Sequence, residues 1–304
     1  MTCAPPDRLF GIYVPGVPPD LPRLHDLERR LGRHAAMISV YCAWGRAETS
    51  GVFAEVRAIL AEGRIPLVTW EPWAGPEGTV EGADPSRDPR FRLRHINDGR
   101  FDAYVGWWAQ QIERVPGRVL LRPMHEMNGN WYPWCGTRNG NHPEEFVSAW
   151  RRVHGIFAEA GARNVDWVWS PYAVSVPDVE DNGLSAYYPG EAYVDWMALD
   201  GYNWGATQPW SCWQEFGEIF DTAYRTLAAL GSRAILITEM GCAETGGNKP
   251  AWIRNTSEIV DTRYPRIRGV VWFNADKECD WRIESSEESL RAFREAWAPE
   301  ARTA

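Results

Sequence analysis

Two kinds of apolar segment alternate along this chain of 304 residues. Short runs rich in Val, Ile, Leu and aromatic residues predict strands, and most are followed by a longer segment whose apolar residues recur at helical spacing. The predicted strands cover residues 9–14, 36–43, 65–70, 119–123, 165–169, 195–201, 234–238 and 269–273. The predicted helices cover residues 21–31, 52–60, 102–115, 143–160, 213–230, 251–264 and 287–297.

This alternation predicts the fold class. Strands that are separated by helices pair in parallel through crossover connections. Eight such units favour an α/β fold of the (β/α)₈ or TIM barrel type over a doubly wound sheet, and no glycine-rich phosphate loop follows the first strand. No Pro/Ser-rich linker or block of like charges divides the chain, so we expect residues 1–304 to form one domain.

Composition and charge exclude several classes of protein. The chain has 32 basic and 41 acidic residues and a net charge of −9, without the basic stripe that nucleic-acid binding requires. No apolar run reaches the ~18 residues that span a membrane. Residues 1–6 lack the basic and apolar regions of a secretory signal, which is either not encoded or has been removed. We expect a monomer that binds neither nucleic acid nor membrane.

Candidate functional residues follow the predicted strands, because active sites of such barrels lie at the C-terminal ends of the strands. Glu126 follows the fourth strand and Glu239 the seventh. The chain also has 18 tryptophans, and several of them lie near strand ends, where flat rings suit the apolar faces of sugars. Five tryptophans within helices are interpreted as structural: Trp107, Trp108, Trp150, Trp252 and Trp297.

Two carboxylates facing each other across a barrel mouth are what cleavage of a glycosidic bond requires. One must protonate the leaving oxygen, and the other must attack the sugar or activate water. The fourth and seventh strands lie nearly opposite each other in a ring of eight. From position alone, however, Glu126 and Glu239 could equally be two solvated glutamates at the rim.

Four segments carry a more specific signal. They are Arg-Pro-Met-His-Glu-Met-Asn-Gly-Asn-Trp at 122–131, Val-Asp-Trp-Met-Ala-Leu-Asp-Gly-Tyr-Asn-Trp at 194–204, Thr-Glu-Met-Gly at 238–241 and Gly-Val-Val-Trp-Phe-Asn at 269–274. In this order, and over nearly the whole chain, the sequence resembles glycoside hydrolase family 26, the β-mannanase family. His125 before the glutamate fits this family, whereas many members of its clan have Asn there.

The resemblance implies roles for individual residues. Glu126 would be the general acid/base and Glu239 the nucleophile, kept ionised by a hydrogen bond from Tyr202. An apolar surround that includes Trp131 would keep Glu126 protonated. The residues expected to bind substrate are His125, Asn128, Trp131, Tyr202, Trp204, Trp272, Trp70 and Trp73, with Trp131 and Trp272 as sugar-stacking platforms. Glu71, Asp200 and Asp276 are interpreted as structural carboxylates.

The resemblance also implies an activity, a retaining endo-β-glycanase that acts on a polysaccharide. β-1,4-Mannan is the first expected substrate, and mixed-linkage β-glucan and β-1,3-xylan are the alternatives. A carbohydrate-binding barrel without activity is the alternative from another class, and the presence of both glutamates argues against it. His125-Glu126 lacks the second histidine of the H-E-x-x-H zinc motif, so we expect no metal and no cofactor.

The six cysteines form no CxxC pair, which argues against a zinc site. Cys242 with Cys279, and less strongly Cys135 with Cys212, would be near enough at the rim to form disulfides, and free buried thiols are the alternative. Because polymers do not cross membranes, a polysaccharide substrate predicts secretion, with a cytoplasmic location as the alternative.

Overall fold

The computed structural model describes residues 8–46, 51–75, 78–79 and 82–297. Its eight strands pair in parallel in chain order, and β8 pairs with β1 to close the barrel. The strands are β1 (Leu9–Tyr13), β2 (Met37–Ala43), β3 (Ile65–Glu71), β4 (Val119–Pro123), β5 (Val165–Trp169), β6 (Trp196–Asn203), β7 (Ile235–Cys242) and β8 (Ile267–Phe273). The predicted (β/α)₈ barrel is confirmed.

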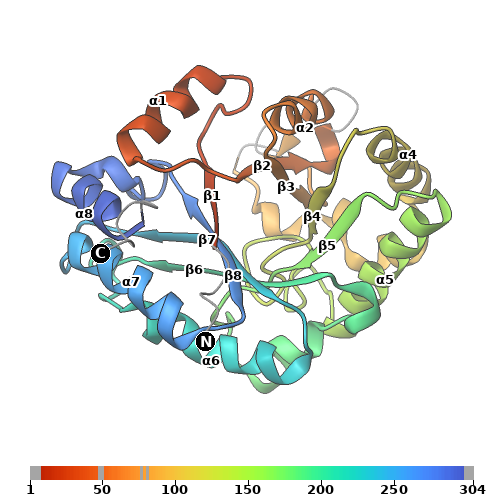
Figure 1. The fold of residues 1–304 in the computed structure, drawn as a ribbon. Helices are drawn as coiled ribbons and strands as arrows, with labels where there is room; N and C mark the ends of the chain where they lie inside the picture. The colour runs from red at the N-terminus through yellow and green to blue at the C-terminus, as the bar shows by residue number, and fades with distance from the viewer. Residues whose placement is uncertain (1–7, 47–50, 76–77, 80–81, 298–304) are drawn as a thin grey trace.

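Helices surround the ring of strands, and the first helix lies beside the last (Figure 1). The described helices are α1 (Leu21–Leu31), α2 (Val52–Ala61), α3 (Leu93–Asn97), α4 (Asp102–Glu113), α5 (Pro143–Glu159), α6 (Phe216–Leu230), α7 (Lys249–Arg263) and α8 (Glu287–Trp297). The connection between β5 and β6 contains short 3₁₀ turns in place of a helix, as the sequence predicts. None of these helices is long and apolar enough to span a membrane.

The structure differs from the predicted elements at two points, one strand end and one additional helix. β7 continues to Cys242, four residues past the predicted end, because Gly241 and Cys242 still pair with β6. The short helix α3 was not predicted. It lies directly after a Gly/Pro-rich stretch of the chain. The remaining predicted helices are found within a few residues of their expected ends.

The barrel interior changes from apolar to polar at one level. Its apolar layer consists of Met37, Leu67, Leu120, Val168, Ala198, Leu236 and Val271. Side chains of a strand alternate between its two faces, so the residue two positions further along each strand also faces inward. On six of these seven strands that residue is polar and buried: Ser39, Thr69, Arg122, Ser170, Asp200 and Thr238. The buried polar layer therefore lies directly beneath the C-terminal mouth.

One irregularity in β7 directs a side chain to the mouth. Leu199 pairs with Ile237, but the next residue of β6, Asp200, pairs with Glu239, so Thr238 is an extra residue in β7. Thr238 bonds to Asp200 inside the barrel, and Glu239 also points inward to contact Arg122. In a regular strand, Glu239 would face the helices instead.

Most of the remaining core lies between the strands and the helices. Four of the five helical tryptophans interpreted as structural are at most 3% exposed, and Trp107 is partly buried against the same core. The expectation for these five residues is confirmed.

Candidate active site

A pocket of about 510 Å³ opens at the C-terminal ends of the strands, and Glu126 and Glu239 both line it. Most of its other side chains are aromatic. These are Tyr41, Trp131, Tyr132, Tyr172, Tyr202, Trp204, Trp210, Phe273 and Trp281. Lys277 and Glu278 contribute charge at one side. The pocket thus combines two carboxylates with flat apolar surfaces.

The backbone that holds Glu126 is in an unusual conformation. Met124 and Glu126 both have a φ of 52°, in the left-handed region that side chains other than Gly, Asn and Asp rarely adopt. Two hydrogen bonds fix this turn: the Met124 N–H donates to the Trp70 carbonyl at 3.1 Å, and the Glu126 N–H donates to the Ser170 carbonyl at 2.8 Å. Such strain is typical of functional sites, where neighbouring strands maintain it.

Glu126 is 6% exposed and accepts one side-chain hydrogen bond, from the Trp131 indole N–H at 2.6 Å. Burial, together with the negative charge of Glu239, raises the pKa of Glu126 well above its usual value. Glu126 is therefore suited to carry a proton near neutral pH. The indole lies over Gly129, where a Cβ atom would come within 2.6 Å of the ring, so the Gly-x-Trp spacing has a steric reason.

Glu239 has a different environment. Its Oε1 accepts hydrogen bonds from the Tyr41 hydroxyl and from the Arg122 guanidinium, each at 2.6 Å. Its Oε2 accepts a hydrogen bond from the Tyr202 hydroxyl at 2.5 Å, as the sequence analysis expects. Three donors, one of them cationic, stabilise an ionised carboxylate. This arrangement suits a nucleophile.

Arg122 connects Glu239 to the polar layer beneath the pocket. It is fully buried, and its Nη1 donates to both carboxylate oxygens of Asp200, at 2.8 and 2.9 Å, while its Nη2 donates to Thr69. Asp200 in turn accepts hydrogen bonds from Ser170 and Thr238. Asp200 is therefore the structural carboxylate that the sequence predicts, and it holds Arg122 in place.

The two glutamates are close together. One carboxylate oxygen of Glu126 and one of Glu239 lie within 4.8 Å of each other, and a ring nitrogen of His125 lies within the same distance of both. Glycosidases that retain anomeric configuration have carboxyl groups about 5–5.5 Å apart, and inverting enzymes about 6.5–9.5 Å apart. The separation agrees with direct attack on the sugar.

The same three side chains could be considered as metal ligands. A cation at this point would compete with the three hydrogen-bond donors of Glu239, and it would be repelled by the guanidinium 2.6 Å from that carboxylate. His125 is buried, and burial, followed by the positive charges of Arg122 and Lys277, lowers its pKa well below the usual value. His125 packs against the rings of Tyr41, Tyr132 and Trp134 at the base of the site.

Two predicted substrate-binding residues, Trp70 and the expected sugar platform Trp272, do not lie at the pocket. Trp70 and Trp272 are both fully buried and line no part of the pocket. Trp70 packs on Trp108, and the Trp272 indole donates to the carbonyl of Trp281. Each follows an inward-facing residue, Thr69 or Val271, so strand alternation directs both indoles toward the helices. Phe273, one residue further on, lines the pocket instead.

Asn128 is also misassigned as a substrate ligand. It is fully buried, and its side chain donates to the carbonyl of Tyr172 and accepts from the N–H of the same residue. It joins the loops after β4 and β5 and thereby positions Glu126 indirectly.

The other predicted substrate residues lie at or beside the pocket. Trp131, Tyr202 and Trp204 line it, and Trp73 lies next to it, against the ring of Tyr132. Sequence reasoning missed Tyr41, Arg122, Lys277, Trp210 and Trp281. An arginine inside an apolar strand requires a buried carboxylate partner, so Arg122 carried a readable signal. The residues in long loops follow no period that would reveal them.

Five of the six cysteines lie within the described residues, and Cys135, Cys212, Cys242 and Cys279 among them are free thiols. Neither Cys242–Cys279 nor Cys135–Cys212 is formed, so the free-thiol alternative holds for these four residues. Burial raises the pKa of Cys135 to about 12, so that thiol is unreactive near neutral pH. Cys3 lies outside the described residues.

Comparisons with known proteins agree with this geometry. The model of glycosyl hydrolase family 26 matches residues 97–284. Endoglucanase H of Acetivibrio thermocellus is 36% identical over 292 residues, which is 94% of this chain and 30% of that protein. Mannan endo-1,4-beta-mannosidase A and B of Caldalkalibacillus mannanilyticus is 41% identical over 91 residues, 28% of this chain and 16% of that protein. The chain therefore spans less than a third of the length of either relative.

Solved structures support the fold. An endo-beta-1,4-mannanase double mutant from Cellulomonas fimi aligns with a TM-score of 0.70 at 17% identity, covering 96% of this chain and 71% of that one. At this identity the likeness concerns the barrel and its strand order. It carries no information on the sugar that the pocket accepts.

Proposed function

Because the chain belongs to glycosyl hydrolase family 26, we propose that it is a retaining endo-β-glycanase. The observation that supports this most directly is the short distance between the oxygens of Glu126 and Glu239, at most 4.8 Å. That separation leaves room for a sugar carbon between them and too little for the additional water that inversion requires.

In the proposed mechanism, the two glutamates act on one bond in two steps. Glu126 donates its proton to the glycosidic oxygen while Glu239 attacks the anomeric carbon and forms a glycosyl-enzyme ester. The ionised Glu126 then removes a proton from water, which displaces Glu239 and restores the carboxylate. During the first step, Tyr41, Arg122 and Tyr202 hold Glu239 in position.

The pocket surface supports cleavage within the chain. Aromatic rings continue outward from Tyr202 to Trp281 (4.8 Å between ring centroids), then to Trp204 (4.8 Å) and Trp210 (5.1 Å). Trp210 is 70% exposed at the outer end, which is unusual for so large an apolar side chain. Such a row can contact several consecutive sugars of a bound chain.

The substrate has two candidates. β-1,4-Mannan is the expectation from the family, and it is supported by the mannosidase relative, which aligns with 28% of the chain. A β-glucan is favoured by Endoglucanase H, which aligns with 94% of it. Substrate choice depends on the loops at the barrel mouth, and the longer alignment includes nearly all of them. That observation gives β-glucan the stronger support from individual relatives.

One set of assays tests both the reaction and the substrate. Reducing-end release is measured in parallel on plain mannan, glucomannan, barley-type β-glucan and β-1,3-xylan, and the first-formed anomer is read by NMR. We expect a β-anomer and a mixture of product lengths from one substrate. An α-anomer would overturn the nucleophile role of Glu239, and a single disaccharide from chain ends would overturn the endo mode.

We further propose that the protein acts as a secreted monomer. The reason is the size of the substrate, since a polysaccharide must be cut outside the cell before its sugars enter. Activity in the medium of the producing cells, and elution at the mass of one chain during gel filtration, test these two statements separately.

A further inference from the structure

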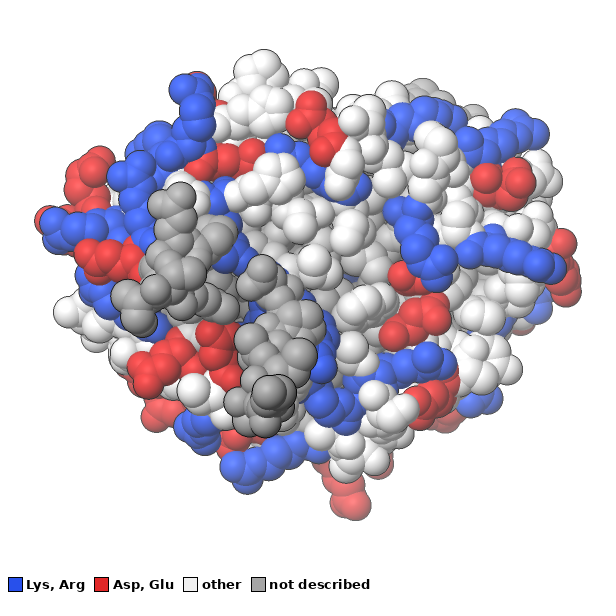
Figure 2. Space-filling model, viewed as in Figure 1, with Lys and Arg blue, Asp and Glu red and all other residues white. Residues whose placement is uncertain are grey.

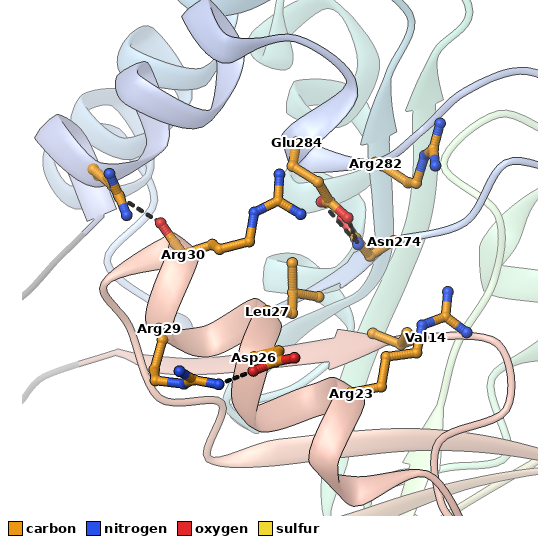
Figure 3. A pocket seen from close by; sticks show the side chains of 10 residues that line it. Val14, Arg23, Asp26, Leu27, Arg29, Arg30, Asn274, Arg282 and Glu284 are labelled. Carbon is orange, nitrogen blue, oxygen red and sulfur yellow. Dashed lines mark hydrogen bonds and ion pairs between the residues drawn. The ribbon is translucent and has the colours of Figure 1, made fainter.

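A second cavity, of about 470 Å³, lies outside the barrel between α1 and α8 (Figure 3). Val14 and Asn274, which follow β1 and β8, form its inner wall. The segment after β8 separates it from the catalytic pocket. Phe273, the last residue of β8, and Trp281 line the catalytic pocket, and the adjacent residues Asn274 and Arg282 line the second cavity.

The lining is strongly basic in an otherwise acidic protein. Five arginines and two carboxylates line the cavity, an excess of three positive charges, although the chain carries −9 in total. Lys and Arg side chains accordingly gather over α1 (Figure 2). The arginines come from segments more than 250 residues apart: Arg23, Arg29 and Arg30 from α1, and Arg282 and Arg294 from the C-terminal segment.

Helical spacing explains how α1 contributes. Arg23, Asp26, Leu27 and Arg30 are at positions i, i+3, i+4 and i+7, so they share one face of the helix. Arg30 is in the last turn, and long side chains lean toward the helix N-terminus. Figure 3 shows Arg30 extending from α1 toward Glu284. The apolar side chain of Leu27 lies in the same cavity.

Of the two carboxylates of the lining, Asp26 is paired with an arginine, whereas Glu284 is held by a neutral amide, which does not cancel a charge. Asp26 forms an ion pair with Arg29, and Glu284 accepts hydrogen bonds from the Asn274 amide at 3.1 and 3.3 Å. Arg282 is paired with Asp280 at 2.6 Å. Two of the five guanidiniums are therefore neutralised by neighbouring carboxylates.

The other three keep their charge. Arg23 donates to the carbonyl of Pro15 at 2.8 Å, and Arg294 donates to the carbonyl of Arg30. Among the described residues, no carboxylate lies within 4.0 Å of the guanidinium of Arg23, Arg30 or Arg294. Carbonyl bonds orient a guanidinium without cancelling its charge, so an oxyanion between these groups would relieve their repulsion and use their free N–H donors.

We propose that this cavity binds a small sugar acid, a monosaccharide or disaccharide that carries a carboxylate or a phosphate. The guanidiniums supply the forked donors that both groups accept, and the space beside them has room for a sugar ring. The volume exceeds what an inorganic ion alone would fill. The site is separate from the glutamates, and it does not depend on the proposed hydrolysis.

Calorimetric titration of the whole chain tests the proposal with glucuronic acid, glucose 6-phosphate, inorganic phosphate and neutral glucose. We expect saturable binding of one of the two sugar acids that weakens with added salt, and none of glucose. Arg30→Gln and Arg23→Gln should each weaken it at least tenfold. Arg163→Gln removes the same charge from an exposed position outside the cavity, and it should leave binding unchanged.

Several results would overturn the proposal. One is the absence of saturable binding at millimolar concentrations, and another is binding of inorganic phosphate as tight as that of the sugar acids. The third is a loss of affinity in Arg163→Gln equal to that in the two cavity variants. Because Arg30 also lies at a helix C-terminus, where a cation stabilises the helix dipole, thermal melting is recorded for each variant. A lower melting temperature with unchanged binding would assign Arg30 to helix stability alone. Binding by Glu239→Gln at wild-type affinity separates this site from the catalytic one.

Discussion

The two active-site glutamates have the same side chain and nearly the same exposure, 6% each, yet their surroundings differ. Glu126 accepts one side-chain hydrogen bond, from the neutral indole of Trp131. Glu239 accepts three, and one comes from the Arg122 guanidinium. The donors contributed by other strands, rather than burial, therefore distinguish the proposed proton donor from the proposed nucleophile. Each of the following substitutions alters one of these two glutamates or a residue that donates a hydrogen bond to it.

The largest expected effect comes from Glu239→Gln. The amide keeps the size of the side chain but cannot attack carbon, so kcat/KM should fall by about 10⁴-fold or more on every substrate. The measurement is reducing-end release on the preferred polysaccharide, with circular dichroism as the control for folding. Activity within tenfold of wild type would show that Glu239 is not the nucleophile.

Glu126→Gln should separate substrates by their leaving groups. On the polysaccharide, loss of the acid should cost about 10²–10⁴-fold. On an aryl glycoside with an activated leaving group, the first step should be spared and the second slowed, which would produce a burst of released phenol. The basic limb of the wild-type pH profile should disappear, because activity is lost there as pH rises through the raised pKa of Glu126. If the basic limb of the pH profile is unchanged in Glu126→Gln, that limb reports the titration of another group.

Arg122→Lys tests the other side of the comparison. Lysine keeps the charge but cannot bond to Asp200, Thr69 and Glu239 together, so we expect roughly a 10²-fold loss of kcat/KM. Weakening a buried network should also cost about 3 kcal/mol of unfolding free energy, read from urea titration. Arg118→Lys on an exposed ion pair beside β4 is the matched control, and it should change neither quantity measurably. Equal effects of the two variants would contradict the role of Arg122.

Trp131→Phe should have the smallest effect. Phenylalanine keeps a ring over Gly129 but removes the N–H that stabilises the ionised form of Glu126. The pKa of Glu126 should therefore rise further, and the basic limb of kcat/KM should move up by about one pH unit, the size expected for one hydrogen bond to a charged group. Trp210→Phe alters a pocket tryptophan away from the glutamates, so its pH profile should match wild type. A shift toward lower pH in Trp131→Phe would reverse the assigned effect of the indole.

The fold was predictable because its signal is periodic and repeated. Eight strands, most of them followed by a helix, strongly favour a barrel, and the strand ends then place Glu126 and Glu239 on one rim. The two wrong substrate-binding predictions, Trp70 and Trp272, come from applying the strand-end rule without the alternation of faces. Counting from Thr69 or Val271 would have directed both indoles outward.

Other parts of the site carry no local signal. Tyr41, Arg122 and Glu239 meet only because β2, β4 and β7 close around a common axis, and their contacts span 117 to 198 residues of sequence. Lys277 and Trp210 lie in loops whose course depends on packing against the completed barrel. For these residues, only the three-dimensional fold determines the neighbours.

The extra residue in β7 has a consequence for engineering. Thr238 and Glu239 both face the barrel interior because the pairing with β6 skips one position. Deleting Thr238 would make the ladder continuous: the glutamate would follow Ile237 directly, pair with Asp200 and still face the interior, but Asp200 would lose the hydrogen bond from the Thr238 hydroxyl. In a regular barrel, a glutamate paired with the residue that matches Asp200 would therefore also face inward, but a design that needs both inward side chains, Thr238 and Glu239, must transfer the skipped pairing as well.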